Sequence, residues 1–342
     1  MLLKELTMIN GVSGDESAVR DYIMDKIALY ADEITVDTIG NLIAFKKGTG
    51  ESSKKIALCA HMDEVGFIVS GITDDGYIKF KPVGGVDERI LLSKRVTVGK
   101  DKIPGVIGIK AVHLCTPDER KSVVKQKDMY IDIGAKDKEA AEKLVTLGDY
   151  IAFDSDYLEF GNGRIKAKAI DDRAGCAMLI ECMKQTYKND MYFCFTTQEE
   201  TGTKGAAIAA HRLELDAAFV IESTTAADVP FMEEHEYATS LGQGPVISVL
   251  DGASKSSNLL NEFIFEVAKE KDISYQIKRT VFGGNDARMF SGRGGSCATA
   301  AVSLPCRYIH SPVCVADVSD YEQMTSLVKG IAENSWKLGG LL

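Results

Sequence analysis

Histidines and carboxylates stand at several places in this 342-residue chain where a short apolar run ends. The stretch IALCAHMDE carries His61 and Asp63, and AVSLPCRYIHSP carries His310. Imidazole and carboxylate groups are the side chains that bind Zn²⁺ and similar divalent ions. If the apolar runs are strands of one parallel sheet, the polar residues after them collect at the edge where ligands bind. The pattern therefore predicts a metal centre assembled from distant segments.

Further carboxylates follow the same pattern. Glu199 and Glu200 come after the run MYFCFTT, Glu222 comes after DAAFVI, and Asp171 and Asp172 begin a helix in AIDDRAG. Taken singly, each motif has a simpler explanation: a hydrogen-bonded structural histidine, a solvated turn, or a helix cap. Taken together they form a cluster of acidic groups that would repel one another, and a bound cation is the simplest relief.

The elements that must position these residues fall into two kinds. In the first part of the chain, Ser13 and Glu16 have capping-box spacing ahead of a helix, and strands are expected over EITVDT, NLIAFKK and KKIALCAH. From Asp171 onward, apolar periodicity predicts alternating elements. The expected helices there are DRAGCAMLIECMK, KGAAIAAHRL, SNLLNEFIFEVAKE and a C-terminal helix preceded by Ser319 and Glu322 and ending near Trp336, and the expected strands are MYFCFTT, DAAFVIE, GPVISVL and SCATAAVSL.

The middle of the chain has a different pattern of strand, turn and helix signals. Residues 67–163 contain short strand-like pieces and turn signals such as Asp75-Gly76 and Asn162-Gly163, with helical periodicity only around residues 136–147. Alternating strands and helices on both sides predict a three-layer α/β/α domain with a mainly parallel sheet. We therefore expect a catalytic domain over residues 1–66 and 164–342, and an inserted, mostly β domain over residues 67–163.

Composition narrows the class of protein. The chain is 45% hydrophobic and 26% charged, which is typical of a globular protein. Its net charge of −10 argues against nucleic-acid binding, which needs clustered Lys and Arg. Its eight cysteines include no C-x-x-C pair, and no apolar run approaches the ~20 residues that span a bilayer. With no signal-peptide pattern at the start, we expect a cytoplasmic protein with no membrane partner.

Several motifs, in this order, resemble those of the M42 metallopeptidases: AHMDEVGF, AIDDRAG, QEETGTKGA, GGNDA and RYIHSP. GVSGDE, IGNLIA and GVIGIKAVHL extend the resemblance over nearly the whole chain. These enzymes are dinuclear, glutamyl-aminopeptidase-like proteins that include the tetrahedral aminopeptidases. The resemblance implies hydrolysis of N-terminal residues of short peptides through a water bridged by two divalent ions. Zn²⁺ is the expected metal, with Co²⁺ or Mn²⁺ as alternatives. The resemblance also implies homo-oligomers built from dimers, up to dodecamers. The insert would lie at the interfaces and limit substrate access.

The resemblance also implies a role for each metal ligand. His61 and Glu222 would bind the first ion, and His310 and Glu200 the second, while Asp171 would bridge the two. Glu222 stands where the family commonly has Asp. It is one methylene longer but still offers oxygen ligands, so we expect the site to be preserved.

Two further carboxylates have implied roles around the metals. Glu199 would be the general base, and Asp63 would orient the ligating His61. The family pattern also implies a cis peptide bond between Asp171 and Asp172. Asn285, in GGNDA, stands where Thr is usual.

Three other functions stay open. A metal-dependent deacylase of N-acyl amino acids could use the same catalytic groups. Some relatives are labelled endoglucanases, but a glycosidase needs two carboxylates and no metal, so His61 and His310 would be unnecessary. A non-catalytic metal-binding assembly protein is supported only by the departure at Glu222, and it would have no use for Glu199 as a spare base.

Overall fold

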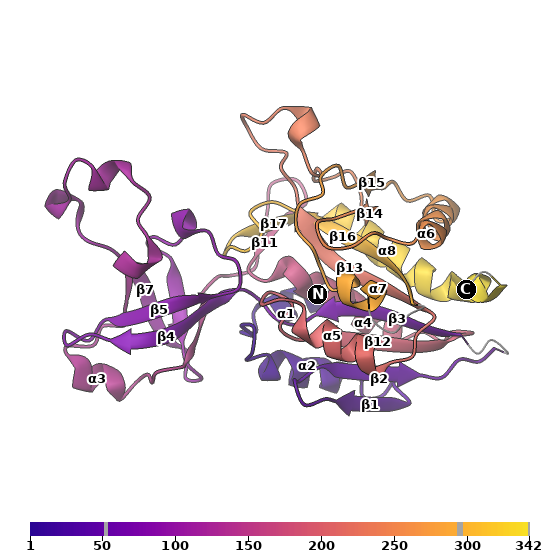
Figure 1. Cartoon of the computed structure of the whole chain (residues 1–342), viewed down its shortest axis with the longest axis horizontal. Coiled ribbons are helices and arrows are strands. Elements are labelled where there is room, and N and C mark those ends of the chain that lie inside the picture. The colour runs from indigo at the N-terminus through magenta and orange to yellow at the C-terminus, as the bar shows by residue number, and fades with distance from the viewer. Residues whose placement is uncertain (51–53, 293–296, 341–342) are drawn as a thin grey trace.

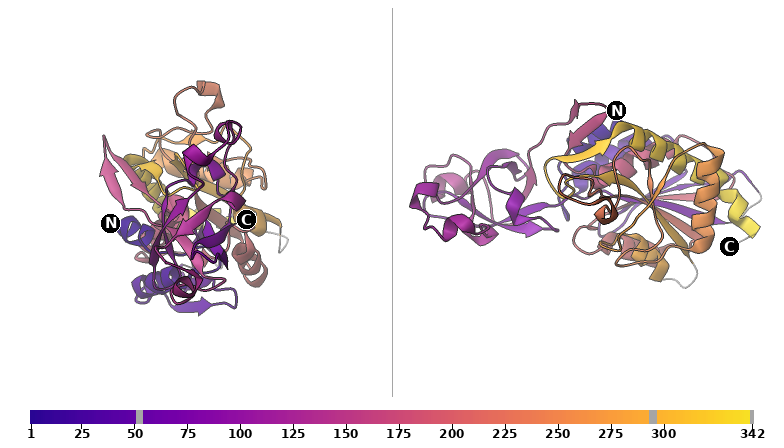
Figure 2. Two further views of the ribbon diagram at one scale, coloured as in Figure 1. Left: turned by 90° about the vertical axis from the view of Figure 1, so that its left-hand side faces the viewer. Right: turned by 90° about the horizontal axis from the view of Figure 1, so that it is seen from above.

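The computed structural model describes residues 1–50, 54–292 and 297–340. It consists of an α/β body and a smaller β-barrel that stands to one side of it (Figure 1). The view from above in Figure 2 shows the same separation, with a narrow connection between the two parts. The chain enters the barrel after β3 and returns to the body before α4, so the barrel interrupts the α/β body. This arrangement confirms the predicted fold class.

Within the described residues, the largest sheet has eight strands in the order β1-β2-β12-β3-β13-β16-β14-β15. The central strands β12, β3, β13 and β16 are parallel, so their carboxyl ends share one edge. Antiparallel pairing joins β1 to β2, β2 to β12 and β14 to β16. The strands are β1 (Glu33–Val36), β2 (Leu42–Lys46), β3 (Lys55–His61), β12 (Asp190–Thr196), β13 (Ala217–Thr225), β14 (Val246–Ser248), β15 (Gln276–Ile277) and β16 (Ala298–Cys306).

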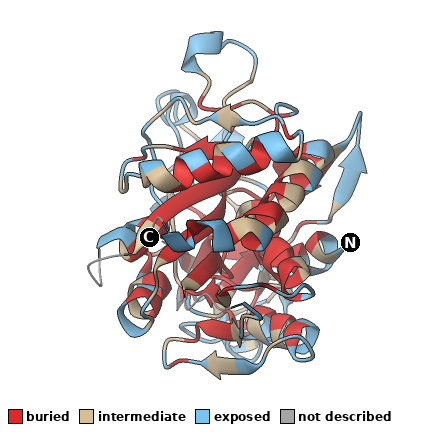
Figure 3. Ribbon diagram, turned by 90° about the vertical axis from the view of Figure 1, so that its right-hand side faces the viewer, coloured by how far each residue is buried: buried red, intermediate tan, exposed pale blue. Residues whose placement is uncertain are grey.

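Helices cover both faces of this sheet. α1, α2, α4, α6 and α8 contribute to the larger apolar core on one face, and α5 and α7 pack on the other. Figure 3 shows the buried strands behind helices whose outward sides are exposed. The helices are α1 (Leu2–Thr7), α2 (Ser17–Ile27), α4 (Ile170–Met183), α5 (Lys204–Arg212), α6 (Asn258–Glu270), α7 (Ala287–Gly292) and α8 (Val318–Asn334).

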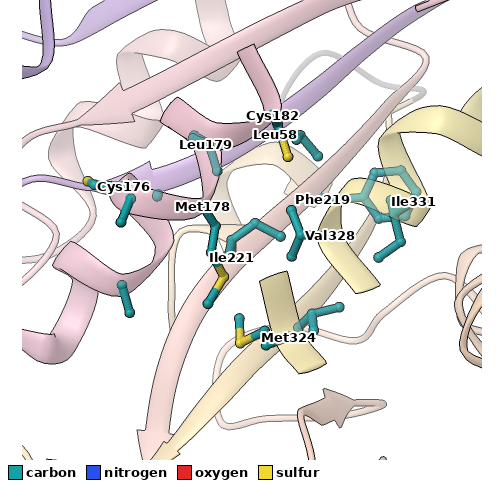
Figure 4. Close-up of a cluster of buried hydrophobic side chains, with 14 of the residues drawn as sticks. Leu58, Cys176, Met178, Leu179, Cys182, Phe219, Ile221, Met324, Val328 and Ile331 are labelled. Carbon is teal, nitrogen blue, oxygen red and sulfur yellow. The ribbon is translucent and has the colours of Figure 1, made fainter. Parts of the chain in front are cut away.

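The main core lies between α4, α8 and the central strands (Figure 4). Met178 and Leu179 of α4 are fully buried, as are Phe219 of β13 and Val328 of α8. Each such apolar side chain contributes roughly 1.5–3 kcal/mol to stability by leaving water. Because α4 is buried along almost its whole length, this packing holds the start of α4 firmly against the ends of β3 and β13.

The barrel closes in the strand order β4-β5-β8-β7-β6-β9. Phe67 lies at the centre of its core and makes edge-to-face contacts with Phe80 and Phe153, with ring centroids 5.1 and 5.3 Å apart. One short helix, α3 (Lys138–Glu142), falls where helical periodicity was predicted. The barrel strands are β4 (Gly66–Ile72), β5 (Ile78–Val83), β6 (Arg95–Val98), β7 (Ile103–Gly108), β8 (Tyr130–Asp132) and β9 (Tyr150–Phe153).

A third, three-stranded sheet joins the two parts of the chain. It contains β10 (Leu158–Phe160), β11 (Arg164–Ala167) and β17 (Cys314–Asp317), all antiparallel. Arg164 forms an ion pair with Asp317 across this sheet. β10 thus lies within the predicted insert, residues 67–163, but it belongs to a sheet with β11 and β17 and not to the barrel.

Some local predictions were wrong. Glu16, not Ser13, is the N-cap residue of α2, and its carboxylate accepts hydrogen bonds from Gly14 N and Gln198 N instead of capping the helix. The N-cap of α8 is Asp317, whose carboxylate accepts from the backbone N–H of Ser319. A Ser-x-x-Glu spacing alone does not locate a helix start, because other oxygens compete for the same N–H groups.

Two strands have limits that differ from the predicted ones or pass outside the described residues. Glu222 lies inside β13, which continues to Thr225, and not beyond the strand end as predicted. The predicted strand SCATAAVSL begins at Ser296, which lies outside the described residues, whereas β16 itself starts at Ala298. Among the described residues, no helix has both the length and the apolar character needed to cross a membrane.

Candidate active site

Asp171 lies between the two histidines at the carboxyl edge of the sheet. Its Oδ1 is 3.3 Å from His61 Nε2, and its Oδ2 is 3.4 Å from His310 Nε2. The two carboxylate oxygens thus face different imidazoles. A carboxylate in this position can serve two cations at once.

His61 is the last residue of β3 and is fully buried. Its Nδ1 is 3.1 Å from the backbone oxygen of Asp63, which leaves Nε2 directed at Asp171 and at Glu222 Oε2, 3.6 Å away. When Nδ1 donates to a carbonyl, the lone pair stays on Nε2, the form of histidine that binds metals. Glu222 reaches this point from β13, the strand next to β3.

His310 approaches Asp171 from the other side and is more exposed. It follows β16, and its Nε2 is 3.2 Å from Glu200 Oε2. Its Nδ1 is 2.9 Å from the backbone oxygen of Gly85, in the segment after barrel strand β5. The orientation of this imidazole therefore depends on a backbone group from the inserted part of the chain.

The buried carboxylate of Asp63 holds the backbone of the Glu199–Glu200 turn. Asp63 Oδ1 accepts a hydrogen bond from Glu199 N at 3.0 Å, and Asp63 Oδ2 accepts from Glu200 N at 3.1 Å. The same carboxylate lies 3.4 Å from His61 Nδ1. Asp63 thus connects one imidazole to the backbone of both glutamates.

The two adjacent aspartates at the start of α4 have different roles. The Asp171–Asp172 peptide bond is cis, as the family resemblance implied, and both residues have non-helical backbone angles. Asp172 Oδ1 accepts from Gly175 N at 2.9 Å, as a helix cap does. The simple capping interpretation therefore holds for Asp172, while Asp171 is free to face the histidines.

Buried cations lock this turn in place. Arg173 is fully buried and donates to the backbone oxygens of Met62 and Leu6 at 2.7 and 2.6 Å. Lys168 Nζ lies 2.5 Å from Glu64 Oε1, and both residues are buried. These contacts connect α1, the end of β3 and the start of α4, so the backbone around Asp171 is fixed from several sides.

Burial and neighbouring charges set the ionisation of the site. Burial opposes the charged form of Asp171, but hydrogen bonds from His310 and His61 outweigh it and lower the pKa of this carboxyl. Burial raises the pKa of Glu200 to about 8, and it raises the pKa values of Glu199 and Glu222 well above the usual range. Without a cation, three acidic groups are thus disfavoured as carboxylates.

Several features fit divalent ions. Ligand atoms of His61, Asp171 and Glu200 lie within 4.8 Å of one another, as do those of His61, Asp172 and Glu222. Glu222 Oε1 and Asp172 Oδ2 are buried without a hydrogen-bond partner, which normally costs about 1–3 kcal/mol for each group. A cation at this place would satisfy these oxygens and favour the ionised forms of the acids.

The cluster opens into a cleft of about 380 Å³. All five predicted ligands and Glu199 line it, while Asp63 lies beneath, fully buried. The remaining lining comes mainly from the end of β13, the segment after it, and residues 278–285. The structure therefore brings the predicted site residues together around one cavity large enough for an amino-acid side chain.

Imidazole and carboxylate groups gathered at the carboxyl edge of an α/β/α sheet form an arrangement that can hold divalent ions and is typical of hydrolases. A family model described as M42 glutamyl aminopeptidase matches residues 40–327. The chain belongs to this M42 family and is a hydrolase of the aminopeptidase class.

Individual relatives agree with this assignment. The chain is 39% identical to a putative aminopeptidase of Acetivibrio thermocellus, covering 96% of each chain. It is 30% identical to a lysyl aminopeptidase of Pyrococcus furiosus, covering 97% of this chain and 96% of that one.

Solved structures share the whole fold. An aminopeptidase from Desulfurococcus kamchatkensis has a TM-score of 0.92 at 36% identity, covering 97% and 93% of the two chains. The TET1 peptidase of Pyrococcus horikoshii, which can assemble into a tetrahedron or a large octahedral shell, has a TM-score of 0.86 at 35% identity, covering 97% and 98%. A Thermotoga maritima protein described as an endoglucanase has a TM-score of 0.83 at 41% identity, covering 100% and 99%.

One contributor to the site could not be found from residue types, and another is marked only by its motif. The carbonyl of Gly85 contacts His310, and a backbone group leaves no signature in the sequence. Asp286 is fully buried beneath the site and accepts from Thr196 Oγ1 at 2.6 Å. Its place in GGNDA, among the motifs that carry the family resemblance, was the available signal.

Proposed function

We propose that this protein is a metal-dependent aminopeptidase that removes N-terminal residues from short peptides with two divalent ions. His61, Asp171 and Glu222 would hold one ion, and His310, Asp171 and Glu200 the other. The observation that carries the proposal is the placement of Asp171, whose two oxygens lie 3.3 and 3.4 Å from two separate imidazole nitrogens. We favour Zn²⁺, with Co²⁺ or Mn²⁺ as alternatives, because the ligands are imidazole and carboxylate groups.

Bound divalent ions would lower the pKa of a water molecule toward neutrality and polarise the scissile carbonyl. A side chain of the protein must then accept a proton from the attacking water and donate it to the leaving group. Glu199 lines the cleft but makes no ion pair among the described residues, so its carboxylate can accept the proton of the attacking water. It then delivers this proton to the leaving amine.

The neighbouring acids have a different task. Glu200 faces His310, and Asp63 accepts from the backbone N–H of Glu199 and Glu200. These hydrogen bonds fix the backbone of both residues, so the proposed base and the proposed ligand keep their separate orientations. The substrate's α-ammonium group would lie near Glu200 or Glu222, because their carboxylates line the same cleft.

The inserted residues contact the candidate site through a backbone group. We propose that residues 1–66 and 164–342 form the catalytic domain and that residues 67–163 form the insert, which contacts the site through Gly85. Because the related TET1 peptidase can assemble into a tetrahedron or a large octahedral shell, we also propose a homo-oligomer built from dimers, up to a dodecamer. Such a shell would admit short peptides. We further propose a cytoplasmic location.

A panel of substrates tests the proposed function. The purified chain, loaded with Zn²⁺, Co²⁺ or Mn²⁺, is assayed on aminoacyl-p-nitroanilides and on N-acetyl amino acids. Aminopeptidase activity predicts cleavage of the free-amine substrates alone, and its loss with a chelator. Cleavage of N-acyl amino acids instead would indicate a deacylase.

Carboxymethylcellulose belongs in the same panel, because the Thermotoga maritima protein with this fold is described as an endoglucanase. Hydrolysis of this polymer that persists in chelator would support a glucanase. Stoichiometric metal binding without turnover of any substrate would support a metal-binding assembly protein.

A further inference from the structure

Two loops line the cleft beside the candidate metal ligands. We call residues 226–241, which follow β13, the cleft loop, and residues 307–315, which follow β16, the histidine loop. Ala227 of the cleft loop and Ile309 of the histidine loop both line the cleft. Figure 1 shows the cleft loop, coloured between magenta and orange, projecting from the top of the α/β body. Because such a loop packs little against the core, the contacts that anchor it determine the shape of the cleft.

Arg307, the first residue of the histidine loop, binds Asp228 of the cleft loop through two parallel contacts. Its Nε donates to Asp228 Oδ1 at 2.8 Å, and its Nη2 donates to Asp228 Oδ2 at 2.7 Å. A guanidinium and a carboxylate paired in this bidentate way have a defined geometry as well as a favourable energy. The exposed fraction of the side chain is 26% for Arg307 and 11% for Asp228, so solvent screens this pair less than a pair on the open surface.

The backbone of Arg307 belongs to the same junction. Arg307 N donates to Val315 O at 2.9 Å, and Val315 N donates to Arg307 O at 3.0 Å, which closes the base of the histidine loop. Val315 packs with Ala226 and Leu241, the two ends of the cleft loop, in a small buried apolar cluster. Asp228 Oδ2 also accepts from Leu241 N at 3.0 Å. Arg307 thus closes one loop with its backbone and binds the other loop with its side chain.

The two halves of the cleft loop are anchored unequally. The second half is bound to β15 by two hydrogen bonds between the side chain of Gln276 and the backbone of Ser240. In the first half, residues 227–233, Asp228 alone forms a hydrogen bond or ion pair with a residue outside the cleft loop, within the part of the chain that the structure describes. Phe231, in the same half, is fully exposed. The position of the first half therefore depends on the pair formed by Asp228.

We propose that Arg307 is a positioning residue that, through Asp228, fixes the cleft loop relative to the histidine loop and so determines which N-terminal side chains the cleft accepts. This inference rests on the proposed aminopeptidase function and adds a determinant of its selectivity. The pair lies outside the cleft lining that the structure describes, so it acts through the neighbouring lining residues Ala227 and Ile309. A loosened cleft loop would weaken contacts that the substrate makes in both the ground state and the transition state, which raises KM without lowering kcat.

Kinetics of the zinc-loaded protein test this role. In Arg307→Met and in Asp228→Asn, KM for Leu-p-nitroanilide should rise about tenfold while kcat stays within about twofold. Differences in kcat/KM among the Ala, Leu and Phe substrates should shrink about threefold, because a mobile loop fits each side chain less closely. Metal content should not change, since neither residue is a proposed ligand. If Arg307→Met does not fold, Asp228→Asn and the conservative Arg307→Lys provide the same comparison.

Three further variants separate positioning from a loss of stability alone. Arg307→Lys keeps the charge but not the planar fork, so KM should rise by a smaller factor, about threefold. Combining Arg307→Met with Asp228→Asn should be no worse than either change alone, because the two residues act as one unit. Asp216→Asn is the matched control. Asp216 accepts from Lys54 Nζ and from Lys55 N, both at 2.8 Å, but at the amino edge of the sheet, so KM should not change.

Limited proteolysis measures the anchoring of the cleft loop without catalysis. Chymotrypsin cleaves after aromatic residues, and Phe231 is fully exposed in the first half of this loop. Cleavage by a protease requires local opening of the backbone, so its rate reports how firmly the loop is held. Arg307→Met and Asp228→Asn should increase the cleavage rate at Phe231 about tenfold, whereas Asp216→Asn should leave it unchanged.

Several results would overturn the proposal. These are an unchanged KM in both Arg307→Met and Asp228→Asn, additive losses in the double variant, or unchanged cleavage at Phe231. A fall in kcat with loss of metal at constant KM would also overturn it and would assign the pair to the metal half around His310. If the wild type cleaves no aminoacyl substrate, the proposed function fails, and proteolysis still decides whether the pair anchors the cleft loop. If the wild type is active and the variants match it, the function stands and the role of Arg307 is wrong.

Discussion

The two halves of the candidate metal centre are built differently. The half around His61 is fully buried and comes entirely from the α/β body, through β3, β13 and the start of α4. The half around His310 is partly open, with about 35% of that side chain exposed. Its imidazole is oriented by the carbonyl of Gly85 from the inserted part of the chain.

This difference shows how the insert takes part in the site. Packing of α4 against the sheet holds the first half without help from the barrel. The second half instead needs the segment after β5, which also places Gly84 next to Glu200. A change in the position of the barrel would therefore affect the half around His310 first, and the two halves should respond differently to substitution.

The largest expected effect distinguishes the base from the ligand. Glu199→Gln should lower kcat by roughly 10²- to 10⁴-fold, the usual contribution of a general base, while metal content stays unchanged. Glu200→Gln should lower occupancy of the ion at His310. Mass spectrometry of metal content alongside kinetics checks both variants. Equal metal loss in the two would contradict this division of roles, and metal loss in Glu199→Gln alone would show that the roles are reversed.

The histidines themselves should differ in their effect on the metal-free fold. His61→Ala removes a fully buried side chain that faces Asp171 and Glu222, so it should cost about 3 kcal/mol of unfolding free energy. His310→Ala should cost about 1 kcal/mol, because partial exposure lets water replace the imidazole. Urea unfolding in chelator measures both. Equal shifts of the midpoint would contradict the distinction between a closed and an open half.

A glycine pair tests the contribution of the insert. A Cβ at Gly84, whose φ is +82°, would meet Val65 Cγ1 at 2.9 Å and Glu200 Cβ at 3.2 Å. Gly134, with φ +75°, has no atom within 4 Å of such a Cβ. Both alanine variants should lose about 1 kcal/mol of stability from the left-handed backbone.

Only Gly84→Ala should also lower kcat/KM, by roughly tenfold, because it displaces Glu200. The two variants are compared by kinetics and by metal titration. Equal activity in both would mean that the segment after β5 does not control the second half of the site.

The smallest expected effect concerns Glu16, which supports Gln198 beside the glutamate pair. Burial raises its pKa to about 7, and the charge of Asp63 adds to this. The folded state therefore holds a proton that the unfolded state releases near pH 4.5, so stability falls as pH rises from about 4.5 to 7. Above pH 7 the full cost is present, at most ~3 kcal/mol.

Glu16→Gln should remove this dependence, since an amide oxygen can still accept from Gly14 N and Gln198 N. Metal-free wild type and variant should have similar stability at pH 5, and the variant should be the more stable by about 1–2 kcal/mol at pH 8. Parallel profiles of melting temperature against pH would rule out the buried Glu16 as the cause.

Much of the fold could be predicted because runs of apolar residues indicate which strands are buried. The runs KIALCAH and AAFVIE are apolar on both faces, as central parallel strands require. Parallel strands share one edge, so His61, Glu200 and His310 could be placed together without knowing the strand order. The direction of β14 could not be predicted, since a short apolar run looks the same whether it pairs parallel or antiparallel.

The remaining details depend on contacts between distant groups. Glu16 was assigned to a capping box by its spacing from Ser13, yet its carboxylate serves Gln198, 182 residues later. Gly85 contributes only a carbonyl, which no residue type reveals. Residue type locates groups capable of chemistry, but tertiary packing decides which of them share a cavity.

The most direct test of the account is a crystal structure of the zinc-loaded protein with anomalous scattering recorded at the zinc edge. The account predicts two peaks flanking Asp171, one next to His61 and Glu222 and the other next to His310 and Glu200. A single peak, no peak, or zinc bound away from Asp171 would contradict the dinuclear site.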